Sequence, residues 1–176
     1  MFSRSHEDRL KRLAQKLEQV AEKDRRRMER EEEMLALRQR AAEELHKLCA
    51  DFVNSINALV TTVHLDLAPP VWETDTLKYN DINMIQINVS GRIVQLSFQI
   101  TDTLEEKIDI RVPYTLHGAV RWFNQDLLER DEVRDDRLYY CIGRSDRGWR
   151  YVDSRSQKLG LVDQEYLTGI IEQLLQ

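Results

Sequence analysis

Residues able to carry catalytic chemistry are few and scattered in this chain of 176 residues. The sequence contains no Gly-x-Ser-x-Gly nucleophile turn, no Gly-x-x-x-x-Gly-Lys phosphate loop, no Gly-x-Gly-x-x-Gly turn and no His-Glu-x-x-His zinc motif. The four histidines are His6, His46, His64 and His117, and most of them lie in helical contexts where a polar surface residue is the usual role. We therefore expect a protein that is not an enzyme and that carries no cofactor.

Two groups of side chains have donor atoms that metal ions bind. His46 and Cys49 are three residues apart, on one face of a predicted helix, but two ligands do not complete a zinc site. The second group is the acidic cluster Asp131, Glu132, Asp135 and Asp136. This cluster lacks the ordered spacing and the turn glycine of a calcium loop. We expect a packed cysteine beside a surface histidine, a solvated acidic segment, and no bound metal.

The cysteines and the apolar runs indicate the cellular compartment of the protein. Cys49 and Cys141 are far apart and follow no Cys-x-x-Cys spacing, so the sequence predicts neither a disulfide framework nor a metal knuckle. No apolar run approaches the ~20 residues of a membrane span, and the N-terminus lacks the apolar segment of a signal peptide. We expect a cytoplasmic protein without a membrane span.

The basic hairpin, residues 144–158, has the composition that most favours ligand binding. Its cations are Arg144, Arg147, Arg150, Arg155 and Lys158. They are interleaved with Tyr140, Trp149 and Tyr151, and a mixture of cations and flat rings is suited to phosphate contacts and base stacking. Strand alternation, however, places Trp149 and Tyr151 on one face and Arg150 on the other. The hairpin can therefore bind nucleic acid, bind an acidic protein segment, or serve only as structure.

These residues are positioned by a long helix that we predict from about Ser5 to Leu67. Apolar residues recur every three or four positions from Met34 onward, which is typical of an amphipathic helix with one buried face. The prolines after Ala68 forbid continuation. The prediction is a charged helical extension over residues 1–33, a core-facing continuation of the same helix over 34–68, and an α+β domain over 71–176.

The helical extension carries a narrow apolar seam of the coiled-coil kind. Its residues Leu10, Leu13, Leu17 and Val20 follow a 3-4-3 spacing. The next three core positions are occupied by Asp24, Arg27 and Glu31. Charged residues at core positions weaken a coiled-coil interface. The register then continues into the second part of the helix. We expect a homodimer, parallel or antiparallel, that self-associates through Leu10, Leu13, Leu17, Val20, Leu45, Leu48 and Phe52. The alternative is that residues 1–33 are a solvated helix.

After the prolines the apolar period changes from that of a helix to that of a strand. We predict a hairpin of strands 85–89 and 94–100, a third strand over 108–112, and a short strand around 77–79. A helix over 115–128 precedes a second hairpin, 138–142 with 149–152, and a last helix capped by Asp163. The fold class is α+β in the order α-βββ-α-ββ-α, with about five mainly antiparallel strands. We expect the sheet face that carries Gln95, Ser97 and Gln99 to be exposed to solvent or to contact a partner.

This order of elements resembles that of the small acidic, dimeric chaperones that hold type III secretion effectors unfolded. The resemblance covers about residues 40–176, rests on topology, and implies a dimer that holds an extended client. The residues themselves favour a non-enzymatic protein-interaction module, which self-associates through its long helix and binds a protein partner through its α+β domain. Nucleic-acid binding through the basic hairpin is the third hypothesis.

Overall fold

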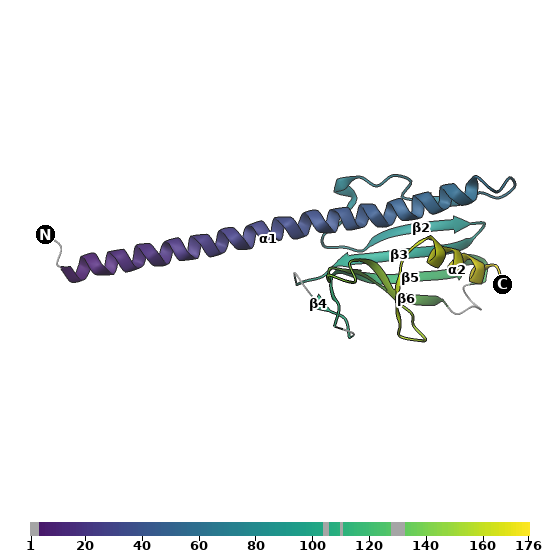
Figure 1. The fold of residues 1–176 in the computed structure, drawn as a ribbon. Helices are drawn as coiled ribbons and strands as arrows, with labels where there is room; N and C mark the ends of the chain where they lie inside the picture. Colours follow the sequence, from purple (N-terminus) through teal and green to yellow (C-terminus); the bar gives the residue numbers. More distant parts are fainter. Residues whose placement is uncertain (1–3, 104–105, 110, 128–132) are drawn as a thin grey trace. The chain divides into compact units, whose positions relative to one another are not determined.

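The computed structural model describes residues 4–103, 106–109, 111–127 and 133–176. The contacts between residues divide the chain into two units, Met1–Leu37 and Arg38–Gln176. Helix α1, Arg4–Asn57, contributes to both units, and the second unit also contains the sheet and helix α2, Gln164–Leu174 (Figure 1).

Helix α1 is continuous through the charged stretch around Arg27 but ends ten residues before the predicted Leu67. The Asn57 side chain explains this end, because its Nδ2 donates to the Leu65 carbonyl at 2.9 Å and its Oδ1 accepts from the Leu65 amide at 2.8 Å. These bonds stabilise a chain reversal. The residues between them include the β-branched run Thr61, Thr62 and Val63, which has low helix propensity. The helix predicted over residues 58–67 was therefore wrong.

The sheet has eight strands among the described residues and is antiparallel throughout. The strands are β1 (Asp66–Ala68), β2 (Asn83–Val89), β3 (Arg92–Ile100), β4 (Glu106–Lys107), β5 (Pro113–Asn124), β6 (Arg134–Cys141), β7 (Gly148–Val152) and β8 (Leu159–Leu161). Their order is β1-β2-β3-β5-β6-β7-β8, with β4 paired to β5. Short 3-10 helices occupy Thr74–Thr76 and Gln125–Leu127. The α+β class and both predicted hairpins are confirmed, whereas the predicted number of strands was too small.

Strand β5 replaces the helix predicted over 115–128. Its inward positions are Leu116, Gly118, Val120 and Trp122. The apolar spacing also matched a helix, but Gly118 is a poor helix former and the aromatic and β-branched residues favour a strand. Leu128 lies outside the described residues, as do Asp131 and Glu132 of the predicted acidic cluster.

Two smaller predictions in the same region were also wrong. Residues 77–79 form no strand. In place of the strand predicted over 108–112 the structure has β4, which is shorter and begins earlier in the chain. Arg111 has a φ of 65°, in the left-handed region that does not continue a strand. Ile110 lies outside the described residues.

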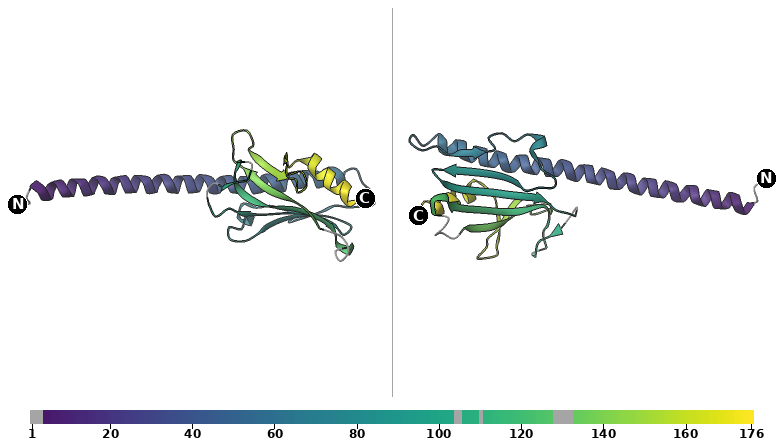
Figure 2. Two further views of the ribbon diagram at one scale, coloured as in Figure 1. Left: turned by 90° about the horizontal axis from the view of Figure 1, so that it is seen from below. Right: turned by 180° about the vertical axis from the view of Figure 1, so that it is seen from behind.

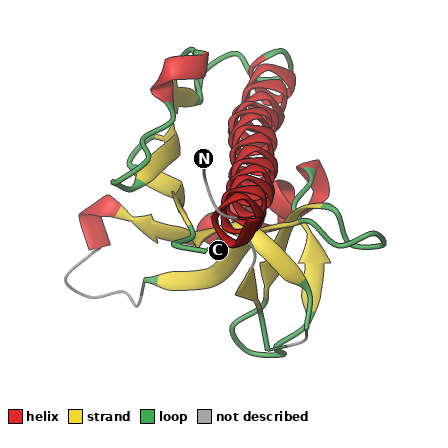
Figure 3. Cartoon of the chain, turned by 90° about the vertical axis from the view of Figure 1, so that its left-hand side faces the viewer, coloured by secondary structure: helices red, strands yellow, loops and turns green. Residues whose placement is uncertain are grey.

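One face of the sheet is covered by residues 38–57 of α1 together with α2. Figure 2 shows β2, β3, β5 and β6 side by side, and Figure 3 shows the strands in an arc around the C-terminal part of α1. The indole of Trp149 in β7 donates to the Ala41 carbonyl of α1 at 2.6 Å, and Phe98 packs edge-on against the Trp149 ring with centroids 5.2 Å apart. The core therefore lies between α1 and the sheet.

The other face of the sheet is polar over much of its area. It carries Gln95, Ser97 and Gln99 on β3, as the strand alternation predicted. The Gln95 amide donates to Gln86 Oε1 at 3.2 Å, and no helix of the described chain packs against this face. A buried cluster of Ile108, Tyr139, Cys141 and Val152 covers one end of this face. On this face Gln99 is exposed, whereas Gln95 and Ser97 are half-buried and Ile93 is buried.

Candidate interaction surfaces

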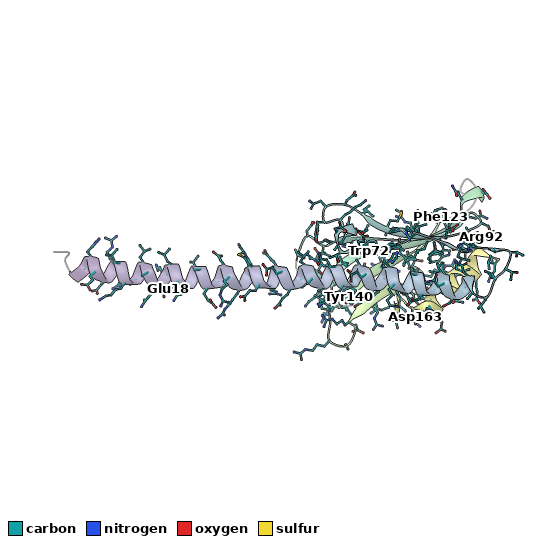
Figure 4. The ribbon with its side chains drawn as sticks, turned by 90° about the horizontal axis from the view of Figure 1, so that it is seen from above. Glu18, Trp72, Arg92, Phe123, Tyr140 and Asp163 are labelled. Atoms are coloured by element: carbon teal, nitrogen blue, oxygen red, sulfur yellow. The ribbon has the colours of Figure 1, made fainter. Side chains whose placement is uncertain are left out.

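The seam on α1 is exposed in the single chain. Leu10, Leu13, Leu17 and Val20 expose 48%, 53%, 61% and 57% of their surface. Figure 4 labels Glu18, which lies between the last two of these residues on α1. Ion pairs within the helix, such as Lys11 with Glu7 at 3.0 Å, stabilise it only weakly, by about 0.3–0.5 kcal/mol each. Nothing in the described part of the first unit buries the seam.

The later residues of the predicted self-association set lie in a different environment. Leu45 and Phe52 are 0% and 3% exposed, and Leu48 is half-buried. Arg38 occupies another position of the same register, and its Nε donates to Thr115 Oγ1 in β5 at 2.7 Å. The heptad register therefore continues along α1, but from Arg38 onward the residues at its core positions contact other residues of the same chain.

The cations of the basic hairpin lie at the two ends of β7. Arg144 and Arg147 are exposed in the turn before this strand, whereas Arg155 and Lys158 are exposed in the turn after it. A strand of this length spans roughly 15 Å at 3.3 Å per residue. Arg150 is half-buried on the strand itself, on the opposite face from Trp149 and Tyr151, as strand alternation predicted. The five cations are therefore not brought together at one point.

The aromatic rings of the hairpin take part in packing inside the protein. Trp149 is buried and bonded to α1, and Tyr140 packs against it with ring centroids 5.4 Å apart. Figure 4 shows Tyr140 beside the C-terminal part of α1. Tyr151 stacks on Tyr166 of α2 at 4.0 Å. Burial makes the first two rings inaccessible to a stacked base, so rings and cations do not share one surface.

A groove of about 710 Å³ lies where α2 meets β7 and β8. The groove is lined by Trp122, Asp136, Tyr151, Asp153, Leu161, Asp163, Glu165, Tyr166, Thr168, Gly169, Ile170, Glu172 and Gln173. Five of these residues carry carboxyl groups and none is basic. We call this the acidic groove. A smaller cavity of about 240 Å³ shares Trp122, Asp136, Asp153 and Gln173 with it.

Local structure fixes three of the carboxylates of the acidic groove. Asp163 caps α2 by accepting from the Tyr166 amide at 2.8 Å, which confirms the predicted cap (Figure 4). Asp153 accepts from the amide of Ser156 at 2.6 Å, and the resulting hydrogen bonds lower the pKa of the Asp153 carboxyl. Asp136 accepts from the Ser154 amide and from the Tyr166 hydroxyl, both at 3.0 Å.

Burial changes the ionisation of two groups that line the groove, Asp136 and Tyr166. Asp136 is 6% exposed, and the loss of hydration raises the pKa of its carboxyl. The hydrogen bonds from Ser154 and Tyr166 act in the opposite direction. Burial, followed by the charge of Asp136, raises the pKa of the Tyr166 hydroxyl far above its ordinary value, so this hydroxyl stays protonated and donates.

Trp122 in β5 forms part of the wall of both cavities. It is 7% exposed, and its Nε1 has no hydrogen-bond partner among the residues that the structure describes. Buried indole N–H groups usually have an acceptor, so this orphaned donor requires an explanation.

Sequence reasoning missed the acidic groove because it placed Trp122 in a helix and Asp136 in a solvated acidic segment. The available signal was the C-terminal segment 159–176, which contains Asp163, Glu165 and Glu172 and no basic residue.

The two groups of metal-donor side chains considered in the sequence, His46 with Cys49 and the acidic cluster, were not expected to bind a metal. No group of three or more His, Cys, Asp or Glu side chains among the described residues is arranged to hold a metal ion. His46 Nε2 lies 2.7 Å from the Pro69 carbonyl, while Cys49 is 0% exposed and burial raises the pKa of its thiol to about 12. Burial raises the pKa of the Cys141 thiol to about 11. Both thiols are therefore protonated and shielded at neutral pH.

None of the helices in the described ranges combines the length and the apolar content needed to cross a bilayer. Comparisons of the chain with protein families, with curated proteins and with solved structures find no match.

Proposed function

We propose that this chain is a non-enzymatic protein-interaction module that self-associates through the first part of α1 and binds a protein partner through its α+β domain. The observation that carries the proposal is the exposure of Leu10, Leu13, Leu17 and Val20 at coiled-coil spacing. A helix that keeps a regular apolar seam without a partner element in its own chain is typical of one that pairs with another helix.

Energetics favour a reversible association. Full burial of a leucine or valine gains about 1.5–3 kcal/mol, and these half-exposed residues gain roughly half of that. Two copies bury eight such side chains, for a gain of roughly 8 kcal/mol, against an association cost of about 4–15 kcal/mol. Since the two terms are comparable, we expect a dimer that dissociates on dilution.

The test is the molar mass in solution as a function of concentration. Sedimentation equilibrium of the full chain should show a mass approaching twice 20.9 kDa as concentration rises. The variant Leu13→Asp/Leu17→Asp should remain at 20.9 kDa, because two carboxylates in the seam cannot be buried together. The matched control Gln15→Asp/Gln19→Asp adds the same charges outside the seam and should dimerise. A wild-type mass of one chain at every concentration would refute the self-association.

A second candidate function is that of a chaperone-like dimer that holds an extended client. Strand β1 pairs only with Gln86, Ile87 and Asn88 of β2, and the remaining residues of β2 have no strand on that side in the described chain. Met84 and the preceding Ile82 are 44% and 53% exposed there. An extended segment can add to such an edge. Retention of a carboxymethylated, permanently unfolded protein, but not of its folded form, supports this function, and retention of neither contradicts it.

A further inference from the structure

We propose that the acidic groove binds a cationic segment of a partner protein, with one arginine or lysine side chain held between its carboxylates. This inference gives the partner-binding half of the proposed function a surface and a chemistry. It does not require the chain to self-associate.

The charge of the groove is the first argument. Asp136, Asp153, Asp163, Glu165 and Glu172 all line it, and no basic side chain does. Glu165 and Glu172 are seven residues apart on α2, which places them on the same side of the helix, and both are exposed. Neither forms an ion pair in the described structure. A concave wall of like charge raises the local concentration of cations and selects against acidic ligands.

The aromatic pair is the second argument. Tyr151 and Tyr166 lie stacked at 4.0 Å with an angle of 16° between their planes, and both line the groove. A guanidinium or ammonium group placed over a tyrosine face is attracted by the ring quadrupole, more strongly when it is partly desolvated. Carboxylates next to a ring face are the combination that recognises the end of an arginine or lysine side chain.

The orphaned indole of Trp122 is the third argument, and it does not depend on charge. Its Nε1 donor is buried and unpartnered in a side chain that forms part of the wall of the groove. The described chain supplies no acceptor for it. The nitrogen itself has almost no exposed surface in the free chain, so a backbone carbonyl of a bound peptide becomes such an acceptor once the wall of the groove shifts on binding. A requirement for an acceptor distinguishes a peptide from a simple amine or an inorganic cation.

The size of the groove agrees with this occupant. At about 710 Å³ the groove falls within the range of roughly 300–1,000 Å³ found for ligand sites. It is long enough along α2 to be lined by residues from Asp163 to Gln173. A short extended segment therefore fits it better than a globular surface does.

The test is fluorescence anisotropy with a fluorescein-labelled peptide of nine residues in which arginine and glycine alternate. The full chain should bind this peptide, and the same peptide with glutamate in place of arginine should not bind. The variant Glu165→Gln/Glu172→Gln should bind about fivefold to tenfold more weakly. The control Glu18→Gln/Glu33→Gln removes the same charge from α1 and should bind as the wild type does. Equal losses in the two variants would show that net charge alone attracts the peptide, and would overturn the proposal.

The indole is tested by Trp122→Phe, which removes the donor and keeps an aromatic ring. We expect about threefold to tenfold weaker binding of the arginine peptide than for the wild type. The urea denaturation midpoint of this variant is measured in parallel, so that lost binding is credited to the indole only if the protein is folded under the assay conditions. Unchanged affinity in the folded variant would refute the role of the indole.

Failure of this inference is distinguishable from failure of self-association. The monomeric variant Leu13→Asp/Leu17→Asp should bind the peptide with wild-type affinity, because the groove lies within residues 122–173. A chain that dimerises but does not bind the peptide refutes the groove alone. A chain that binds the peptide but stays monomeric refutes the seam alone.

Discussion

Gly118 shows how one residue can decide the packing of the sheet. It faces Phe98 across the β3–β5 pair, and a Cβ atom built on it would lie 1.8 Å from the Ser97 carbonyl oxygen. A methyl group cannot occupy that position unless the two central strands separate.

We therefore predict that Gly118→Ala lowers the free energy of unfolding by about 2–3 kcal/mol or more, measured by urea denaturation. The matched control is Gly169→Ala in α2, where an added Cβ meets nothing within 4 Å. Because alanine is the better helix former, this control should be neutral or stabilising by up to about 1 kcal/mol. Equal stability of the Gly118→Ala variant and the wild type would show that the strands do not approach this closely.

The carboxyl group of Asp136 should make stability depend on pH. Its pKa is raised in the folded protein above the ordinary value of 3.8, so the folded state holds the proton more tightly than the unfolded chain does. Stability is then greatest where the carboxyl is protonated, and it falls as the pH rises from about 3.8 through the raised pKa.

Asp136→Asn removes this titration. We predict that the free energy of unfolding of the wild type, taken relative to that of the variant, decreases as the pH rises over this window. Urea denaturation of both proteins at a series of pH values measures the difference, and other groups cancel because they are common to both. A difference that grows with pH would mean that the hydrogen bonds from Ser154 and Tyr166 outweigh the cost of burial.

At the scale of elements, the cap of α2 lends itself to a direct test. Asp163 accepts from the Tyr166 amide at 2.8 Å, and the buried Leu167 and Ile170 lie in the two turns that follow. We predict that Asp163→Ala lowers the free energy of unfolding by about 1 kcal/mol, the usual cost of a lost N-cap. Gln164→Ala, one residue further on and exposed, is the control and should change it by less than about 0.5 kcal/mol. A neutral Asp163→Ala variant would mean that packing alone positions this helix.

The elements predicted correctly from the sequence are those whose signals are local. Strands β2 and β3 alternate apolar and polar residues around Ser90 and Gly91, and Gly91 has a φ of 81° that suits the turn. The cap and apolar face of α2 are equally local. The basic hairpin strands and the continuous α1 were also predictable for this reason.

The elements predicted wrongly depend on contacts that a local sequence pattern does not encode. In β5 the apolar residues satisfy both a helix period and a strand period, and the pairing of β5 with β3 and β6 establishes the strand that local propensity only favours. The end of α1 depends on the bonds between Asn57 and Leu65, which no propensity scale contains. The assembly of the acidic groove was missed for the same reason, since it joins residues of β5, β6 and α2.

At the scale of the whole molecule, the two units have separate roles in the proposal. The unit Arg38–Gln176 contains all eight strands and α2, whereas Met1–Leu37 contains the seam. The packing described above for Leu45, Phe52 and Trp149 lies entirely within the larger unit.

We predict that a chain beginning at Met34 keeps the far-ultraviolet signal of the sheet but loses the ability to dimerise. Sedimentation equilibrium should give the mass of one shortened chain at every concentration. The full chain should also show a melting temperature that rises with concentration, and the shortened chain should not, because only association couples stability to concentration. A dimer formed by the shortened chain would place the self-association in the α+β domain instead.

The two outermost strands, β1 and β8, are only three residues long each. A long, flat edge strand can pair with the edge strand of another copy, and repeated pairing of this kind produces aggregates. Short edge strands offer too few backbone groups for such pairing. Short edge strands therefore limit aggregation in a protein that we propose binds other proteins. Concentrated solutions of the intact chain should accordingly remain clear and free of thioflavin-positive fibrils, even while the seam brings copies together in pairs.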